Sequence, residues 1–497
     1  MAVLGLDIGT TGSRAVLVSS DGQLLATSTE FHEAFSSPET GWAEQDPDDW
    51  WRAAQAAIQA VVGEFDNEDI EAVGLSGQMH GAVLLDGDGA VVRPAIIWCD
   101  QRTDEQCRWL TEQVGASRLI ELVSNPALTG FTLPKLLWVR EHDPEAWKRV
   151  RSLMLPKDYV RFRLTGERAT DVADASGTLM FDVANRCWSL EVLDLTKINP
   201  DWLPTVHEGI AVTGRVSPAG ERATGLRAGT PVVAGGGDQA AGAVGMGVVR
   251  PGTVSTTIGT SGVVFAVTDR PALDTFGRVH TFCHAVPNRW HVMGVTQGAG
   301  LSLRWFKDTF GLDDSAHDTG MDPYDRLCAE AEEAPVGADG VMWAPYLMGE
   351  RTPHLDPYAR AALVGLSASH GRAHVTRAIL EGVAFSLRDS LTIFNEMNLP
   401  TTRIRLGGGG ARSSLWRQIQ ADVYGQAVNV LAAEEGAAFG AALLAGVGAG
   451  VWSSVDDVCN SVVDVAHTIE PVPEHVAIFE DCYRRYRSLY NALHPLG

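Results

Sequence analysis

The chain opens with three short apolar runs separated by turn-forming residues. Val, Leu and Ala gather in residues 4–7, 15–19 and 24–29, and glycine, threonine and aspartate lie between these runs. Asp21-Gly22 is typical of a tight turn between the second and third runs. The pattern predicts an antiparallel meander of three strands.

An amphipathic helix is predicted next, over residues 48–62. Asp46 is suited to cap its N-terminus, and Pro47 is favoured at the first helical position. Apolar residues recur there at helical spacing, so one face of the helix is expected to be buried. These residues are Trp51, Ala54, Ile58 and Val61.

Strand and helix patterns then alternate, and the second half of the chain repeats the plan of the first. The first half has strand patterns at 70–75, 83–85, 95–98 and 232–234, helical patterns through most of 104–163, and a small-residue helix at 239–246. The second half has a meander at 253–295, then helices, a strand at 404–406 and helices at 414–424 and 436–444.

Such alternation predicts an α/β fold in which each domain is a mixed sheet flanked by helices. A chain of 497 residues is also too long for a single core. We therefore expect two similar domains, residues 1–247 and 248–497, which face each other across a central cleft.

One pentapeptide occurs in both halves at equivalent places. Ile-Gly-Thr-Thr-Gly at residues 8–12 returns as Ile-Gly-Thr-Ser-Gly at residues 258–262, each between two strand patterns. Glycines allow backbone N–H groups to converge on a small anion, and hydroxyl groups add further donors. A single copy would favour an ordinary hairpin turn. Two copies, each with an aspartate nearby, favour a pair of phosphate-binding turns.

Composition and charge exclude several classes of protein. The net charge of -23 disfavours nucleic acid and anionic membranes as partners. No apolar run is long enough to span a bilayer, and the N-terminus lacks the features of a secretory signal. Seven scattered cysteines with no C-x-x-C indicate reduced thiols, so a cytoplasmic location is expected.

Two aspartates are candidates for the chemistry. Asp7 ends the first predicted strand beside the first turn, where it is either a solvated turn residue or a ligand of Mg²⁺. Asp238 lies between a glycine run and a helix of small residues. It is either a helix cap or a general base that takes a proton from an attacking hydroxyl group.

A run of four glycines at residues 407–410 follows a strand pattern and precedes a helix. Together with Ser413, it leaves room for a base or ribose to press on the backbone. The run does not have the context of a dinucleotide fingerprint, and the chain contains no P-loop motif.

Four residues that follow first-half strands suit a sugar. Met79 and Trp98 can line its apolar face, whereas His80 and Asp100 can bind its hydroxyl groups. A lone histidine is more often a satisfied core residue, so the combination matters more than any member.

Several longer motifs resemble those of the FGGY carbohydrate kinases. The opening residues 5–11 are similar to the first phosphate loop of that family, residues 132–138 to its first signature, and residues 363–366 through His374 to Glu381 to its second. Residues 76–81, 97–102, 157–161 and 174–178 resemble the members that act on D-xylulose. Glycerol kinases usually carry an Arg-Glu pair where this chain has Met79-His80. The match runs nearly end to end.

The resemblance implies an actin-like (ribonuclease-H-like) fold that transfers phosphate from ATP, with Mg²⁺, to a sugar bound by the N-terminal domain. It implies that D-xylulose becomes D-xylulose 5-phosphate within D-xylose catabolism, and it suggests a homodimer. By the same resemblance Asp238 accepts the proton and Met79 and His80 contact the ketose. The residues expected to hold the nucleotide and its phosphates are Thr10, Thr11, Gly259, Thr260, Gly409, Gly410 and Ser413.

Two other functions stay open. One is a kinase for another ketose or polyol, such as ribulose, gluconate or glycerol. The other is an actin-like nucleotide switch whose ATP turnover depends on a protein partner.

Overall fold

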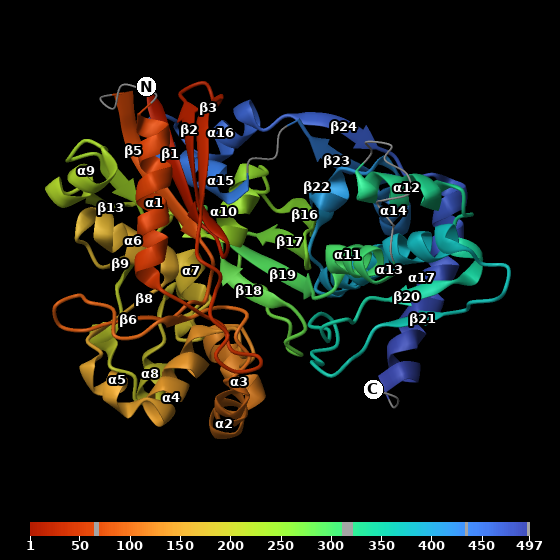
Figure 1. The fold of residues 1–497 in the computed structure, drawn as a ribbon, viewed down its shortest axis with the longest axis horizontal. Helices are drawn as coiled ribbons and strands as arrows, with labels where there is room; N and C mark the ends of the chain where they lie inside the picture. The colour runs from red at the N-terminus through yellow and green to blue at the C-terminus, as the bar shows by residue number, and fades with distance from the viewer. Residues whose placement is uncertain (64–68, 311–321, 433–435, 495–497) are drawn as a thin grey trace.

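Two α/β halves lie side by side in the computed structural model, which describes residues 1–63, 69–310, 322–432 and 436–494. In Figure 1 the N-terminal half (red to yellow) is on the left and most of the C-terminal half (teal to blue) is on the right. Each half is built around a seven-stranded mixed sheet.

The first sheet has the strand order β13-β14-β5-β1-β2-β3, and β15 also pairs with β5. Strands β1, β2 and β3 form the predicted antiparallel meander, and β5 runs parallel to β1. The strands are β1 (Ala2–Ile8), β2 (Gly12–Ser19), β3 (Leu24–Phe31), β5 (Ile70–Gly77), β13 (Val212–Arg215), β14 (Pro231–Val233) and β15 (Gly236–Gly237).

The second sheet repeats this topology in the order β18-β19-β17-β16-β22-β23-β24. Strand β16 pairs antiparallel with β17 and parallel with β22, as β1 does with β2 and β5. The strands are β16 (Gly252–Ile258), β17 (Gly262–Thr268), β18 (His280–Cys283), β19 (Trp290–Thr296), β22 (Thr401–Gly408), β23 (Val428–Leu431) and β24 (Val465–Ile469). The internal repeat predicted from the pentapeptides is therefore a repeat of fold.

Short two-stranded ribbons and helices complete the two halves. The ribbon strands are β4 (Glu44–Gln45) with β7 (Ala95–Ile96), β6 (Val83–Leu85) with β8 (Ser152–Met154), β9 (Ala169–Asp171) with β12 (Thr205–His207), β10 (Phe181–Asp182) with β11 (Cys187–Trp188), and β20 (Met342–Ala344) with β21 (Ala362–Val364). The first-half helices are α1 (Pro47–Val62), α2 (Asp104–Val114), α3 (Ala116–Val123), α4 (Thr132–His142), α5 (Pro144–Arg149), α6 (Pro156–Thr165), α7 (Val172–Ser176), α8 (Leu190–Thr196), α9 (Pro218–Thr224) and α10 (Asp238–Gly245). The second-half helices are α11 (Ala299–Phe310), α12 (Pro323–Glu332), α13 (Arg372–Glu396), α14 (Ser414–Tyr424), α15 (Gly436–Gly448), α16 (Val455–Val462) and α17 (Pro473–Leu493).

Helix α1 forms where the sequence predicts it. The Asp46 side chain accepts a hydrogen bond from the Asp48 amide, and Pro47 occupies the first turn. All four predicted face residues are buried. They pack with the apolar side chains of β1 and β5, so α1 covers one face of the first sheet.

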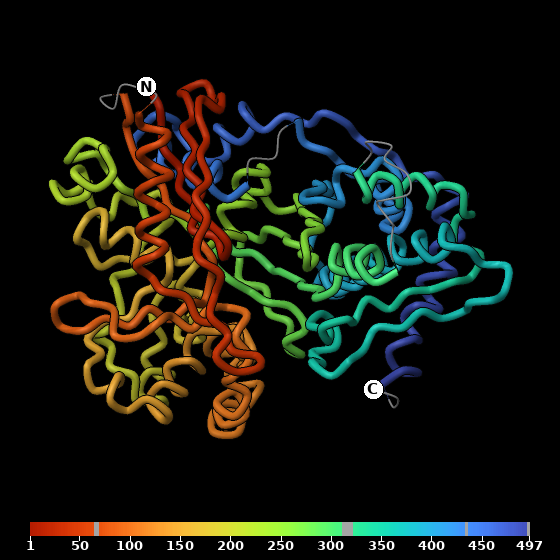
Figure 2. The backbone as a smooth tube through the Cα atoms, in the orientation of Figure 1, coloured from red at the N-terminus to blue at the C-terminus, as the bar shows by residue number. Residues whose placement is uncertain are grey.

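The other face of the first sheet is covered by a helix from the far end of the chain. Helix α15 packs on β1, β5 and α10, and Figure 2 shows this blue segment returning beside the red N-terminal strands. Glycines make the approach possible. A β-carbon on Gly5 would lie 1.9 Å from the Ala438 carbonyl oxygen, and one on Gly74 would lie 2.0 Å from that of Ala441.

Two predicted elements differ from the structure. The strand predicted over residues 95–98 ends at Ile96, because its partner β4 has only two residues and leaves nothing for Trp98 to pair with. The strand predicted at 232–234 ends at Val233, and a separate short strand, β15, forms within the triple glycine and pairs with β5.

The contact between α15 and α10 predicts a large effect from one methyl group. A β-carbon on Gly440 would lie 1.8 Å from the carbonyl oxygen of Ala241, so the helices would have to separate. We expect Gly440→Ala to lower the free energy of unfolding by about 1–3 kcal/mol, measured by denaturant titration.

The matched control is Gly242→Ala on α10, where a β-carbon meets no atom within 4 Å. Alanine is favoured over glycine within a helix, so this variant should be neutral or slightly more stable. Equal melting temperatures for the two variants would contradict this account of the helix contact.

Candidate active site

The ends of neighbouring strands bring the two candidate aspartates to one edge of the first sheet. Asp7 on β1 is in register with Ser76 on β5 and with Arg14 on β2. On the other side of β5, Gly237 of β15 is in register with Gly77, and Asp238 follows as the first residue of α10. Asp7 and Asp238 therefore flank the end of β5.

Burial and mutual repulsion make both carboxyl groups hold their protons more tightly than usual. Burial raises the pKa of Asp7 to about 6, and the Ser76 hydroxyl and the Arg14 guanidinium oppose this shift. Burial raises the pKa of Asp238 to about 7, and the negative charge of Asp7 adds to the shift. Asp238 is thus close to the pKa that suits a general base at neutral pH.

Side chains from other segments hold the first glycine-threonine turn, residues 8–12, by hydrogen bonds. The Thr10 hydroxyl accepts a hydrogen bond from Trp98 Nε1 at 2.9 Å, and the Thr10 carbonyl oxygen accepts one from Gln45 at 2.8 Å. Gln78 donates to the Gly9 carbonyl oxygen at 3.3 Å. Thr11 is exposed at the tip of the turn.

Met79 and His80 form a platform beside Asp238. A β-carbon on Gly237 would lie 2.7 Å from Met79 Cγ, so the residue before Asp238 packs directly on Met79. His80 Nδ1 lies 2.6 Å from the Gly177 carbonyl oxygen, and its ring packs edge-on against Phe131 at 4.9 Å. Burial lowers the pKa of His80 to about 3, so the imidazole is neutral.

Asp100, predicted to bind hydroxyl groups of a sugar, is held by hydrogen bonds within the protein. Its side chain is fully buried, its Oδ2 accepts hydrogen bonds from the Ala43 amide at 2.6 Å and Arg102 at 2.7 Å, and its Oδ1 accepts one from the Arg102 amide at 2.9 Å. These hydrogen bonds tie Asp100 to the loop after Trp98. A contact of Asp100 with a sugar stays a prediction.

The second glycine-threonine turn opens onto a cavity of about 600 Å³ in the C-terminal half. Gly259, Thr260, Gly409, Gly410 and Ser413 all line this cavity. Five of the predicted nucleotide residues are thus brought together by the fold. The local sequence patterns did not indicate the other side chains of the wall, among them Arg304, Tyr324, Cys328, Arg412 and Trp416.

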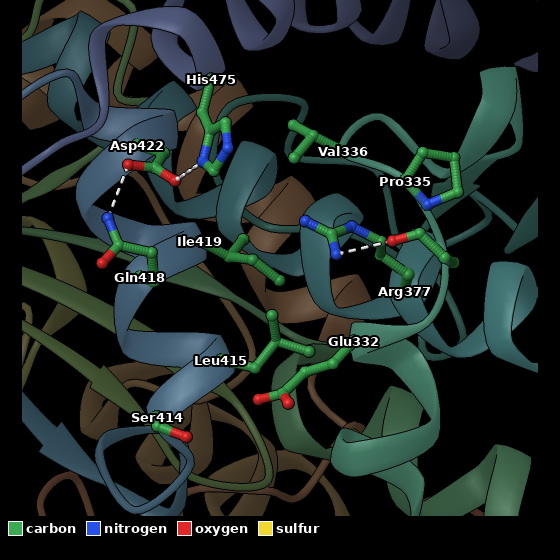
Figure 3. Close-up of a pocket in the computed structure, with 11 residues that line it drawn as sticks. Glu332, Pro335, Val336, Arg377, Ser414, Leu415, Gln418, Ile419, Asp422 and His475 are labelled. Carbon is green, nitrogen blue, oxygen red and sulfur yellow. Dashed lines mark hydrogen bonds and ion pairs between the residues drawn. The ribbon is translucent and has the colours of Figure 1, made fainter.

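A further cavity of about 410 Å³ lies between α12, α13, α14 and α17 and contains none of the predicted site residues. Figure 3 shows Asp422 of α14 bound to His475 of α17 and to Gln418. Each contact measures 2.8 Å, and the one with His475 ties α17 to α14. This cavity is separate from the site at the strand ends.

The carboxylates of the site suit a divalent cation that is also held by phosphates. Asp7 Oδ1 is buried without a hydrogen-bond partner among the described residues, and a second carboxylate is close enough to repel it. The described part of the chain holds no group of three or more metal-binding side chains. A single carboxylate completed by phosphate oxygens and water is the usual environment of Mg²⁺.

Comparison with known proteins decides the family. The model for the N-terminal domain of the FGGY family of carbohydrate kinases matches residues 2–245, and the model for the C-terminal domain matches residues 254–449. The chain belongs to the FGGY family of carbohydrate kinases.

Individual members of this kinase family match along almost the whole chain. The chain is 40% identical over 495 residues to a xylulose kinase of Escherichia coli, with 99% of each chain covered. It is 38% identical over 490 residues to one of Bacillus subtilis, with 98% of this chain and 96% of that one covered. The crystal structure of xylulose kinase from Rhodospirillum rubrum superposes with a TM-score of 0.92 at 32% identity, covering 100% of this chain and 99% of that one.

A cluster of buried charged side chains lies behind the Met79-His80 platform of this carbohydrate kinase, and local sequence patterns did not predict it. Lys157 lies 2.6 Å from carboxylate oxygens of both Asp158 and Asp171 and 3.3 Å from Asp174. All four side chains are fully buried. The only signal in the sequence was the family motifs that contain Lys157, Asp158 and Asp174.

None of the described helices is long and apolar enough to cross a membrane.

The raised pKa of Asp238 predicts how pH affects stability. An aspartate whose pKa rises from 3.8 to about 7 on folding stabilises the folded state at low pH, and this stabilisation is lost as the pH rises through 7. Asp238→Asn removes the buried negative charge. We therefore expect this variant to melt at a higher temperature than the wild type near pH 8.

The gain should shrink near pH 5.5, where most wild-type molecules carry the proton on Asp238. Thermal melts at both pH values check this, since the difference between the two proteins isolates position 238. A gain that is equal at both pH values, or a loss at pH 8, would show that Asp238 is not a buried acid with a raised pKa.

Proposed function

We propose that this kinase transfers the γ-phosphoryl group of ATP to D-xylulose and forms D-xylulose 5-phosphate in D-xylose catabolism. The observation behind this proposal is the Met79-His80 platform next to Asp238, in a chain similar along its full length to xylulose kinases. A neutral imidazole and a thioether suit the hydroxyl groups and the apolar face of an uncharged sugar.

Asp238 acts as the general base in this proposal. It takes the proton of the primary hydroxyl group as that oxygen attacks the γ-phosphorus and the bond to the β-phosphate oxygen breaks, so ADP leaves. Its position at the start of α10, one strand away from Asp7, holds the carboxylate at the edge of the first sheet. Its pKa of about 7 leaves it partly ionised at neutral pH and able to accept a proton.

The two repeated turns bind the nucleotide. Gly409, Gly410 and Ser413 lie against the base and ribose in the 600 Å³ cavity, beside the aromatic side chains of Tyr324 and Trp416. Gly259 and Thr260 of the second turn hold phosphates at the wall of the same cavity. The turn at Thr10 and Thr11, of which Thr11 is exposed, offers hydroxyl and backbone donors to the terminal phosphates.

Asp7 would hold Mg²⁺ together with phosphate oxygens and water. The bound cation would neutralise charge on the transferring phosphoryl group. The fit rests on the unpaired buried oxygen of Asp7 and on the second carboxylate nearby.

We also propose a cytoplasmic homodimer. All seven cysteines are free thiols, which fits a reducing compartment. The homodimer rests on family resemblance alone, and size-exclusion chromatography with light scattering tests it.

A panel of acceptors tests the choice of sugar. Coupled ADP-release assays with D-xylulose, D-ribulose, gluconate and glycerol should give the highest kcat/KM for D-xylulose. A higher value for another acceptor would replace D-xylulose in the proposal. ATP turnover that needs a protein partner and no sugar would favour the nucleotide switch.

Removal of the base tests the mechanism. Asp238→Asn should lower kcat with D-xylulose by at least about 100-fold, because no other group accepts the proton. ADP binding, measured by calorimetry, should stay within about twofold of the wild type. Asp104→Asn, an exposed acid in the first turn of α2, is the control and should keep full activity. Substantial turnover by Asp238→Asn would end the assignment of Asp238 as base.

A further inference from the structure

A loop of the C-terminal half carries an arginine to the sugar side of the N-terminal half. Arg351 lies in the segment between β20 and β21. One of its terminal nitrogens would be 3.9 Å from a β-carbon on Gly130, and that same position is 3.1 Å from the Trp98 carbonyl oxygen. The charge of Arg351 also lowers the pKa of His80. The guanidinium thus lies close to two of the predicted sugar-binding residues.

The residues on either side of Arg351 fix its backbone. The Glu350 carboxylate accepts hydrogen bonds from the Thr296 hydroxyl at 2.5 Å and from the Gln297 amide at 2.9 Å. The Thr352 amide donates to the Val295 carbonyl oxygen at 2.9 Å. Both neighbours are therefore attached to the end of β19, and the arginine is presented from a rigid part of the second sheet.

The guanidinium has no protein partner among the described residues. Its neighbour Glu350 is engaged elsewhere, and no carboxylate of the described chain forms an ion pair with Arg351. Burial lowers the pKa of Arg351, and the residue as a whole is half-buried. By contrast, the buried side chains of Arg377 and Arg102 are paired, Arg377 with Glu381 at 2.8 Å and Arg102 with Asp100 at 2.7 Å.

A half-buried guanidinium with five N–H donors and no protein acceptor is available to donate hydrogen bonds to a ligand. The nucleotide phosphates are one source of acceptor oxygens, and the sugar is the other. The nucleotide cavity has its own arginines, Arg304 and Arg412, and Arg351 is not part of its lining. The neighbours of Arg351 are Trp98, His80 and Gly130, which favours the sugar.

We propose that Arg351 donates hydrogen bonds to oxygen atoms of the bound sugar, so that the sugar site is built from both halves of the chain. This inference rests on the proposed function. Its consequence is that a sugar with suitably placed oxygens holds the C-terminal half against the N-terminal half, whereas water alone does not. Binding of the sugar then also places the nucleotide of the C-terminal half in position for transfer.

The test compares Arg351→Met and Arg351→Lys with the wild type in steady-state kinetics. Arg351→Met should lower kcat/KM for D-xylulose by about 10- to 100-fold, the usual effect of losing hydrogen bonds from a charged group. KM for ATP and the slow ATP hydrolysis without sugar should change less than about twofold. Arg351→Lys, which keeps a cation, should lie between the two.

The matched control is Arg360→Met in the same loop, because the Arg360 side chain is exposed and contacts only carbonyl oxygens of its own segment at 2.8–3.2 Å. It should keep the kinetics of the wild type. Melting temperatures of all variants check the fold, and Arg351→Met should melt within about 2 °C of the wild type because it breaks no protein contact.

The outcomes separate the two proposals. A rise in KM for ATP with unchanged KM for D-xylulose would assign Arg351 to the phosphates and overturn the inference, and unchanged kinetics would overturn it as well. If the wild type prefers another acceptor of the panel, the proposed substrate fails. The effect of Arg351→Met on the KM for that acceptor then decides the inference by the same criteria.

Discussion

The close contact of α15 with the first sheet and α10 joins the two halves of this kinase. Three glycines, at positions 5, 74 and 440, allow backbone to meet backbone where any side chain would collide. A second attachment reinforces it, since Trp452 donates a hydrogen bond to the Ser20 carbonyl oxygen at 3.0 Å. Helix α10, which begins at Asp238, packs against α15, the same helix that lies on β1 and β5 of the first sheet.

The two halves share a sheet topology but differ in the residues that follow equivalent strands. Strands β5 and β22 occupy equivalent places, with Gly77 in register with Ile8 and Gly408 in register with Ile258. After this point the first half continues into Gln78, Met79 and His80, whereas the second continues into two more glycines. In the proposed function, the bulky side chains at the first strand end form a platform for the sugar. The glycines at the second strand end leave room for the nucleotide.

The buried charges around Lys157 in the N-terminal half have an unfavourable desolvation energy. Lys157 and its three aspartates have left water completely, and such a cluster is often less stabilising than apolar packing of the same volume. Its members come from α6, β9 and α7, so the cluster fixes these elements relative to one another. A β-carbon on Gly237 would lie 3.4 Å from Asp174, which brings the cluster up to the residue before Asp238. The cluster therefore gives Met79 a rigid support.

Local sequence patterns by themselves determined much of the secondary structure and the positions of the candidate aspartates. The meander, α1 with its Asp46 cap, the repeat of fold and the strand ends with Asp7 and Asp238 all follow from local patterns of apolar residues, glycine and proline. Contacts between distant segments do not follow from such patterns. Four examples are the packing of α15 on β1, the contact of Asp100 with Ala43, the charge cluster at Lys157 and the approach of Arg351 to Trp98. Each joins residues that lie far apart along the chain or on different elements. Only the packed tertiary structure decided them, because burial, and the need of each buried charge for a partner, depends on the whole fold and not on neighbours along the chain.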